Sequence, residues 1–98
     1  MQIHGTFSHL AAADSLLDRD VSFTRVQHKR LQKTAEHIRA NGYDPGRLHV
    51  LNSYGIPNHP DMHLQMVRPG IALYGVLSRA DNPVKPDVTL LPVLSLKA

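Results

Sequence analysis

Residues 21–53 read VSFTRVQHKRLQKTAEHIRANGYDPGRLHVLNS and predict a helix that a tight turn joins to a β-strand. Asn41 and Gly42 close the helix, because glycine suits the left-handed residue just past a helix end. The basic residues of the helix mostly fall between apolar residues that recur at helical spacing. These apolar residues, expected to form the core-facing side, are Phe23, Val26, Leu31, Ala35 and Ile38.

Strands are predicted on both sides of this helix. Residues 3–10, IHGTFSHL, have the composition of a buried strand, and residues 48–53, LHVLNS, and 63–68, HLQMVR, are the second and third candidates. Regular structure is expected to break at residues 54–60, which hold a glycine and two prolines. IALYGV, residues 71–76, fits either a short strand or a turn of helix. A helix between consecutive strands indicates an α/β fold with a parallel sheet.

The end of the chain has a different character. Residues 78–92, SRADNPVKPDVTLLP, contain three prolines and predict an extended linker. VLSLKA, residues 93–98, follows as a further strand candidate. Because the chain begins and ends in strand-like sequence, we expect it to be a piece of a longer protein.

The composition is that of a globular protein and narrows the possible functions. Of the 98 residues, 42% are hydrophobic and 19% are charged, and the formal net charge is +3. With no cysteine, neither disulfides nor a thiolate metal site can form. No apolar stretch has the length of a membrane span, and the first residues lack the pattern of a signal peptide. The small basic excess does not by itself indicate a partner.

Polar residues and glycines gather where the predicted strands end, which is where parallel α/β folds place their functional groups. The Ser53 hydroxyl and the N–H groups of Gly70 and Ile71 are donors of the kind that holds a phosphate. Taken one at a time, Ser53 and Gly70 are also ordinary strand-end and turn residues. Arg68 is harder to explain in that way, because a guanidinium among apolar neighbours needs a partner. The candidates are His9, Asn52, Ser53, Arg68, Gly70 and Ile71.

Two further patterns have simpler explanations. His59 and His63 are four residues apart among seven histidines, but no HExxH motif is present and Pro60 disfavours one helix carrying both. We therefore expect solvent-exposed histidines and no metal site. The basic run RVQHKRLQK, residues 25–33, has no interleaved aromatic residues, so it indicates the solvated outer face of a helix and no nucleic-acid partner.

Three motifs together resemble the alanine racemase family, whose members use pyridoxal 5′-phosphate. They are GTFSHLAAAD at residues 5–14, LHVLNSYG at 48–55 and MVRPGIALYG at 66–75, in this order and at these separations. ADSLLDRDVSFTRVQ and NSYGIPNHP are also similar to the serine or alanine racemase domains attached to membrane segments in glycopeptide-resistance systems.

The resemblance implies a particular place in the family's fold. Residues 1–78 would be the C-terminal part of a (β/α)8 TIM-like barrel that binds pyridoxal phosphate, roughly its last three strands. Residues 79–92 would be a linker, and residues 93–98 the start of the family's β-rich second domain.

The resemblance also implies roles for the strand-end residues. Arg68 matches the arginine that hydrogen-bonds the pyridine nitrogen of the cofactor, where a permanent cation disfavours ring protonation and makes the cofactor a weaker electron sink. His9 would fix the orientation of Arg68. The remaining residues would hold or flank the cofactor phosphate, and they are Ser53, Asn52, Gly70 and Ile71.

The family's two catalytic bases have no counterpart in this sequence. The lysine that carries the cofactor belongs to the first barrel strand, and the tyrosine base belongs to the second domain. None of Lys29, Lys33, Lys85 and Lys97 lies at a strand end that faces the proposed site, and none of Tyr43, Tyr54 and Tyr74 matches the tyrosine. The chain alone is therefore expected to be inactive.

The resemblance implies a fragment of an enzyme that interconverts L- and D-alanine, or serine, for cell-wall precursor synthesis. The complete enzyme would be a homodimer with an amino-acid substrate, located in the cytoplasm or as the cytoplasmic domain of a membrane-anchored protein. The fragment, with open sheet edges, is expected to self-associate. The alternative is an inactive truncated product that acts at most as a phosphate-binding or interaction module.

Overall fold

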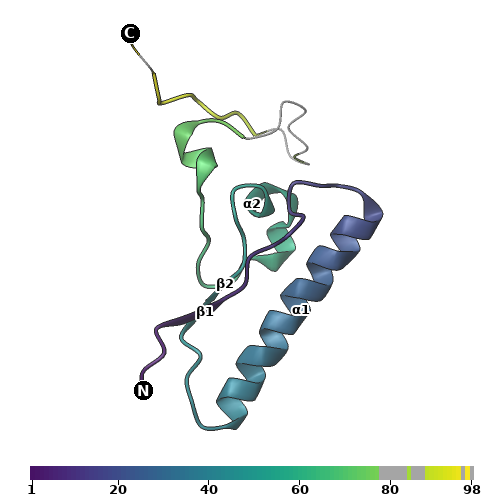
Figure 1. The fold of residues 1–98 in the computed structure, drawn as a ribbon, viewed down its shortest axis with the longest axis vertical. Helices are drawn as coiled ribbons and strands as arrows, with labels where there is room; N and C mark the ends of the chain where they lie inside the picture. The colour runs from purple at the N-terminus through teal and green to yellow at the C-terminus, as the bar shows by residue number, and fades with distance from the viewer. Residues whose placement is uncertain (78–83, 85–87, 96, 98) are drawn as a thin grey trace.

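A long helix and two short parallel strands form the body of the molecule (Figure 1). The computed structural model describes residues 1–77, 84, 88–95 and 97. The strand–helix–strand order is the α/β arrangement that the sequence predicts. In chain order the elements are β1 (Gly5–Phe7), α1 (Asp18–Ala40), β2 (Arg47–His49), α2 (Gly55–Asn58) and the 3₁₀ helices η1 (Pro60–Met62) and η2 (Ile71–Tyr74).

The strands are parallel, as predicted, but shorter. Gly5 lies opposite Arg47 and Phe7 opposite His49, and a single parallel bridge joins His49 to Met66. The third predicted strand, 63–68, is thus reduced to one bridge. The prediction that the first strand is buried is wrong, because Phe7 is 63% exposed. Among the described residues, β1 also has a neighbouring strand along one edge only.

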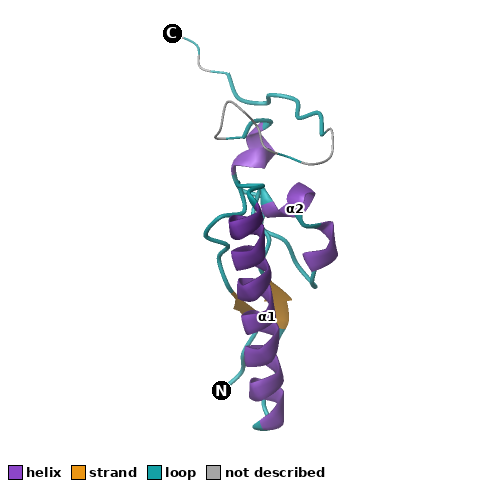
Figure 2. Cartoon of the chain, turned by 90° about the vertical axis from the view of Figure 1, so that its right-hand side faces the viewer, coloured by secondary structure: helices purple, strands orange, loops and turns teal. Residues whose placement is uncertain are grey.

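Helix α1 lies along the strands and covers one side of them (Figure 2). Its buried residues are Thr24, Leu31 and Ala35, and these mark the face that packs. Leu31 and Ala35 were predicted to be in the core, but Phe23 and Val26 are 47% and 43% exposed. Apolar spacing therefore identified the helix correctly and misjudged which way its first turns face.

Thr24 carries a buried polar atom that gives a stability prediction. The residue is fully buried, and among the described residues its Oγ1 has no hydrogen-bond partner. Thr24→Val keeps the shape and removes the unsatisfied hydroxyl, so we expect the free energy of unfolding to rise by about 1 kcal/mol in urea titrations. Thr34→Val is the control, because Thr34 is exposed and its hydroxyl already bonds Arg30 O at 2.9 Å. A loss of stability in Thr24→Val would contradict the prediction.

The segment after β2 forms helical turns where the sequence predicted a break. Asn52 Oδ1 accepts a hydrogen bond from Gly55 N–H at 2.9 Å and so fixes the start of α2. At the end of α2, buried Asn58 donates to Ala13 O at 3.0 Å, which ties the loop after β1 to this segment. The core between these parts and α1 consists of Leu10, Ala13, Leu31, Val50, Leu51, Tyr54 and Met62.

Residues 71–77 and 88–95 lead away from the strands (Figure 1). IALYGV takes the helical alternative as η2, which ends at Gly75 in the left-handed conformation (φ 78°). No strand forms at residues 88–95, so the strand predicted at 93–98 is absent at 93–95. Residues 96 and 98, and 79–83 and 85–87 of the predicted linker, lie outside the described residues.

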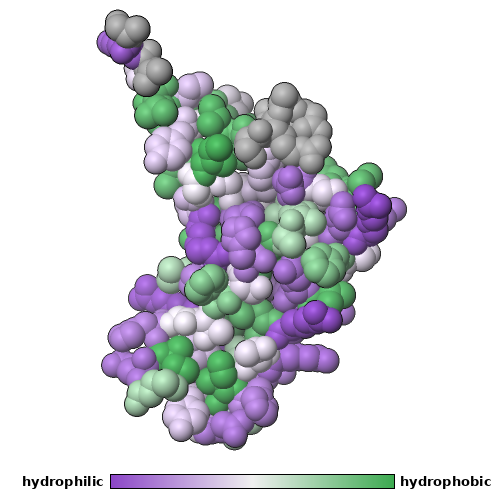
Figure 3. All heavy atoms as spheres, viewed as in Figure 1, coloured by the Kyte–Doolittle hydropathy of each residue, from purple (hydrophilic) through white to green (hydrophobic). Residues whose placement is uncertain are grey.

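Apolar side chains gather on the surface at this end of the molecule, at the top of Figure 3. Leu91, Val93 and Leu94 are each more than 70% exposed. The part of the chain that the structure describes contains no helix long and apolar enough to cross a membrane.

Candidate cofactor site

One pocket brings together all six residues predicted from the strand ends. It has a volume of about 270 Å³ and lies where the carboxyl ends of β1 and β2 meet the segment bridged at Met66. Parallel sheets commonly bind ligands at this edge. The lining residues are His9, Asn52, Ser53, Tyr54, Arg68, Gly70 and Ile71, of which only Tyr54 was not predicted.

Arg68 is held by acceptors from both strand ends. Its backbone N–H donates to Leu51 O at 2.9 Å. In the guanidinium, Nη2 donates to Ser8 O at 3.0 Å and to Val50 O at 3.5 Å, while Nη1 donates to His49 O at 3.3 Å. Among the described residues, Nε is the guanidinium nitrogen without a hydrogen-bond partner. Arg68 is thus fixed in orientation with one donor still available.

His49 is the side chain that orients Arg68, a role the sequence assigned to His9. Arg68 Nη1 lies 2.7 Å from His49 Nδ1. An arginine has only protons to give, so Nδ1 must accept and the imidazole proton resides on Nε2. Burial, and then the positive charge of Arg68, lower the pKa of His49, which favours this neutral form. Phe7 completes the group, since it stacks on His49 with ring centroids 5.2 Å apart and lies 5.0 Å below the Arg68 guanidinium.

His9 lines the pocket, and among the described residues no hydrogen bond joins it to Arg68. Because β1 ends at Phe7, the residues after it leave the strand direction, and the His9 side chain is exposed. The backbone there is held from α1 instead: Gln27 Nε2 donates to His9 O at 3.2 Å, and Gln27 Oε1 accepts from Ala11 N–H at 3.0 Å. Sequence reasoning missed Gln27. Its only signal is a polar residue one helical turn from Thr24 and from Leu31, which mark the buried face of α1.

Ser53 stands at the centre of the predicted phosphate-binding groups. Its Oγ accepts hydrogen bonds from Gly70 N–H at 2.9 Å and from Ala72 N–H at 3.2 Å. A hydroxyl has two acceptor positions and one donor, so the proton of Ser53 is the group left to donate. The prediction grouped Ser53 with the N–H groups of Gly70 and Ile71, and the structure adds that the hydroxyl itself bonds Gly70 and Ala72. Ser53 is 7% exposed, which holds that proton in a sheltered position.

The histidines do not form a metal centre among the described residues. No group of three or more histidine, aspartate or glutamate side chains there could hold an ion. His63 is exposed as expected, with Nε2 3.2 Å from Ile56 O. His59 is 1% exposed, so the expectation of solvent-exposed histidines is wrong at that position.

The model of one protein family matches residues 1–78, and its description is the N-terminal domain of alanine racemase. The chain belongs to the alanine racemase family. This match confirms the resemblance of the three motifs to alanine racemases.

Alanine racemases of known sequence match the whole chain. The alanine racemase of Geobacter sp. (strain M21) is 38% identical over 98 residues, which are 100% of this chain and 25% of that protein. The serine/alanine racemase of Enterococcus gallinarum is also 38% identical over 98 residues, or 14% of its length. The chain therefore spans a quarter or less of these relatives.

Solved alanine racemases share the fold. The enzyme of Clostridium difficile 630 in complex with cycloserine superposes with a TM-score of 0.69 at 32% identity, over 91% of this chain and 23% of that one. The enzyme of Streptomyces lavendulae gives a TM-score of 0.67 at 29% identity, over 85% and 21%. These neighbours support the α/β fold.

Proposed function

We propose that this chain forms the cofactor-positioning part of a racemase that depends on pyridoxal 5′-phosphate and acts on alanine or serine. In this proposal residues 1–78 correspond to the C-terminal part of the barrel, 79–92 to a linker and 93–98 to the start of the second domain. The observation that carries the proposal is the convergence of Arg68, Ser53 and the Gly70–Ile71 segment on one pocket.

The groups around the pocket fit a phosphorylated pyridine. The lining contains a fixed guanidinium, a hydroxyl with a proton to donate and backbone N–H groups, and it contains no carboxylate. Such a set complements a dianionic phosphate together with the lone pair of a ring nitrogen. The cofactor, when bound, supplies an electron-withdrawing ring that acidifies the α-proton of an attached amino acid.

In this site the residues of the chain bind and orient. Arg68 presents Nε–H to the ring nitrogen, and because a guanidinium does not lose its charge, it disfavours protonation of that nitrogen. The Ser53 hydroxyl proton and the Ile71 N–H are the donors that would hold the phosphate, and the Gly70 N–H would join them by sharing the bond that it donates to Ser53 Oγ. His49 and the backbone oxygens of Ser8 and Val50 keep the guanidinium in place.

We further propose that the two bases that exchange the α-proton come from outside these 98 residues, so that the chain alone does not racemise amino acids. The complete enzyme would be a homodimer that supplies D-amino acids for cell-wall precursors, in the cytoplasm or as the cytoplasmic domain of a membrane-anchored protein. These properties rest on the family relationship.

Pyridoxine 5′-phosphate tests the binding role without side reactions, because it lacks the aldehyde that lysines attack. In NMR titrations of the chain we expect it to shift the amide signals of Gly70 and Ile71, and we expect pyridoxine without phosphate to bind more weakly. Ser53→Ala should weaken binding of the phosphate form by at least about five-fold and leave pyridoxine binding unchanged.

Two variants control this experiment. Ser22→Ala changes an exposed serine of α1 and should have no effect. Ser53→Thr keeps the hydroxyl, both as a donor and as the acceptor from Gly70 and Ala72, and should retain the affinity that Ser53→Ala loses. Equal affinity of wild type and Ser53→Ala for pyridoxine 5′-phosphate, or shifts confined to the lysines of α1, would refute the proposed function.

A further inference from the structure

The backbone that follows β1 is held by one side chain of α1. β1 ends at Phe7, so the residues beyond it have left the strand. Gln27 Nε2 donates to His9 O at 3.2 Å, and Gln27 Oε1 accepts from Ala11 N–H at 3.0 Å. These two bonds flank Leu10, whose side chain is 3% exposed and packs in the core. The chain is therefore fixed at the point where it leaves the sheet.

This fixed backbone carries an acceptor of Arg68. Ser8 precedes His9, and its carbonyl oxygen accepts from Arg68 Nη2 at 3.0 Å. The other acceptors of the guanidinium, which are His49 O, His49 Nδ1 and Val50 O, belong to β2 (Arg47–His49) or to the residue after it. Among the described residues, Ser8 O is thus the acceptor on the β1 side. Because a guanidinium is planar and rigid, holding it from both sides also fixes the direction of Nε–H.

The two hydrogen bonds of Gln27 require an amide. His9 O can only accept and Ala11 N–H can only donate, so the side chain opposite them must offer one donor and one acceptor. The end of a glutamine offers both, whereas an ionised glutamate offers acceptors only. A glutamate at this position would place a negative oxygen against the carbonyl oxygen of His9 and leave that oxygen without its donor.

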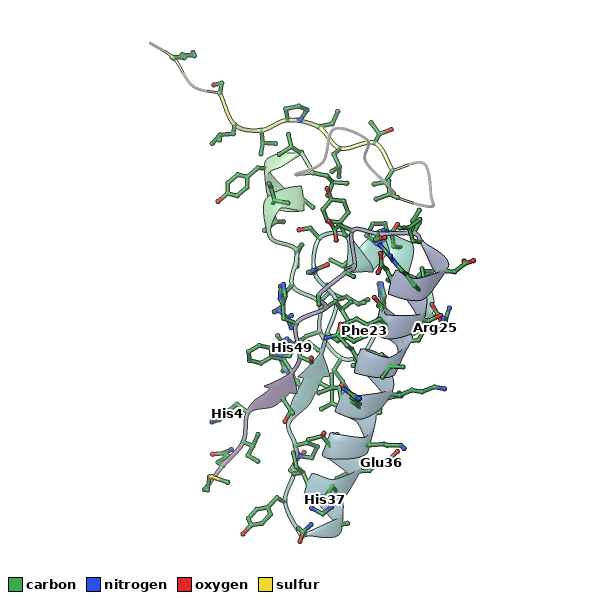
Figure 4. The ribbon with its side chains drawn as sticks, turned by 45° about the vertical axis from the view of Figure 1, so that its right-hand side comes forward. His4, Phe23, Arg25, Glu36, His37 and His49 are labelled. Carbon is green, nitrogen blue, oxygen red and sulfur yellow. The ribbon has the colours of Figure 1, made fainter. Side chains whose placement is uncertain are left out.

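Helix α1 reaches Arg68 from across the strands. His49, whose imidazole bonds Arg68, lies beside the strands on the side away from α1 (Figure 4). Helix α1 covers the other side (Figure 2). The connection from the Gln27 amide to the guanidinium therefore runs through the backbone of residues 8–9.

We propose that Gln27 is a positioning residue for the cofactor ring: its amide fixes the loop after β1, so that Ser8 O holds the Arg68 guanidinium with Nε–H directed into the strand-end pocket. The identity of the ring rests on the proposed function, whereas the hold on the guanidinium does not. Both of these hydrogen bonds of Gln27 go to the loop after β1, and the phosphate donors lie at Ser53, Gly70 and Ile71. Loss of the amide should therefore affect the ring and not the phosphate.

Three small probes test this role on the full chain. Pyridoxine carries the ring, inorganic phosphate carries the anion, and pyridoxine 5′-phosphate carries both. In NMR titrations we expect Gln27→Glu and Gln27→Met, which keep the length and helix propensity of the side chain, to weaken both ring probes by the same factor, at least about three-fold. Inorganic phosphate should bind as it does to wild type. A merely structural role of Gln27 would weaken all three probes together.

Gln32 provides the matched controls, because it is an exposed glutamine of the same helix. Gln32→Glu and Gln32→Met make the same chemical changes and should bind all three probes like wild type. Equal affinity of wild type and the Gln27 variants for pyridoxine would overturn the positioning role, as would a loss of the same size in the Gln32 variants.

Rotation of the Arg68 guanidinium tests the hold without any ligand. Nη1 and Nη2 give separate ¹⁵N signals while rotation about the Nε–Cζ bond is slow, and rotation requires breaking the bond to Ser8 O. We expect rotation to be at least about three-fold faster in Gln27→Glu and Gln27→Met than in wild type, and unchanged in the Gln32 variants.

The two measurements separate this role from the proposed function. Unchanged rotation in the Gln27 variants would overturn the hold of Gln27 on Arg68, whatever the probes do. If no probe bound to wild type, the proposed function would fail, and faster rotation in the Gln27 variants would still support the hold on the guanidinium.

Discussion

Gly46→Ala is expected to disrupt the pairing of β1 with β2 and to lower the free energy of unfolding by roughly 3 kcal/mol. Gly46 has a φ of 67°, in the left-handed region, and its N–H donates to Asp44 Oδ1 at 2.9 Å in the turn before β2. A Cβ built there would overlap the backbone of His4 and Gly5, which cannot move away without breaking the register. Urea titrations followed by circular dichroism measure the loss.

Gly42→Ala separates the two causes of this effect, which are the left-handed backbone and the overlap of a Cβ with the backbone of β1. Gly42 has a similar φ of 81°, but no atom lies within 4 Å of the position a Cβ would take. Only the left-handed backbone cost should remain, about 1 kcal/mol. If both variants lost the same stability, the close approach of residue 46 to β1 would not be a constraint in solution.

Arg68→Gln is expected to raise the pKa of His49 and to destabilise the chain by about 2 kcal/mol. The variant removes the guanidinium that bonds His49 Nδ1, Ser8 O and Val50 O. Burial and the charge of Arg68 hold the pKa of His49 below its ordinary value, so the neutral imidazole stabilises the fold above about pH 6.5. That contribution is lost as the pH falls, and Arg68→Gln should reduce this pH dependence. NMR titration of the imidazole signals measures the pKa.

Arg68→Lys is the matched variant, because it keeps the charge and loses the planar fork of donors. We expect stability to fall while the pKa of His49 stays low. A pKa of His49 that is the same in wild type and in Arg68→Gln would show that the contact does not shape its titration.

The sequence predicted the order and direction of the elements better than their extent. Helix α1 was found with its C-terminal end at Asn41 and Gly42, because spacing and glycine chemistry are local signals. Strand length depends on neighbours: HLQMVR has a strand-like composition, yet only Met66 finds a partner in the described residues. Phe23 and Val26 follow the helical period but are exposed, whereas Thr24 is buried. Packing, and not the polarity of the side chains, therefore determines which face of this part of the helix is buried.

The pocket was predicted from one topological rule, that the carboxyl ends of parallel strands meet. That rule placed Ser53, Arg68 and Gly70 together, and the structure does so. It gave no access to side-chain direction, and the role of His9 in orienting Arg68 was taken from the family resemblance. Only the paired register shows that His49 faces the same side as Phe7 and reaches Arg68.

The hydrogen bonds of Gln27 to His9 O and Ala11 N–H limit how this sequence can change by insertion or deletion. One residue added to α1 between Gln27 and Leu31 would turn the residues that precede it by about 100° relative to those that follow. Either the amide would leave the loop after β1, or Leu31 and Ala35 would leave the core. Length changes should therefore be absent between Gln27 and Leu31 in related chains.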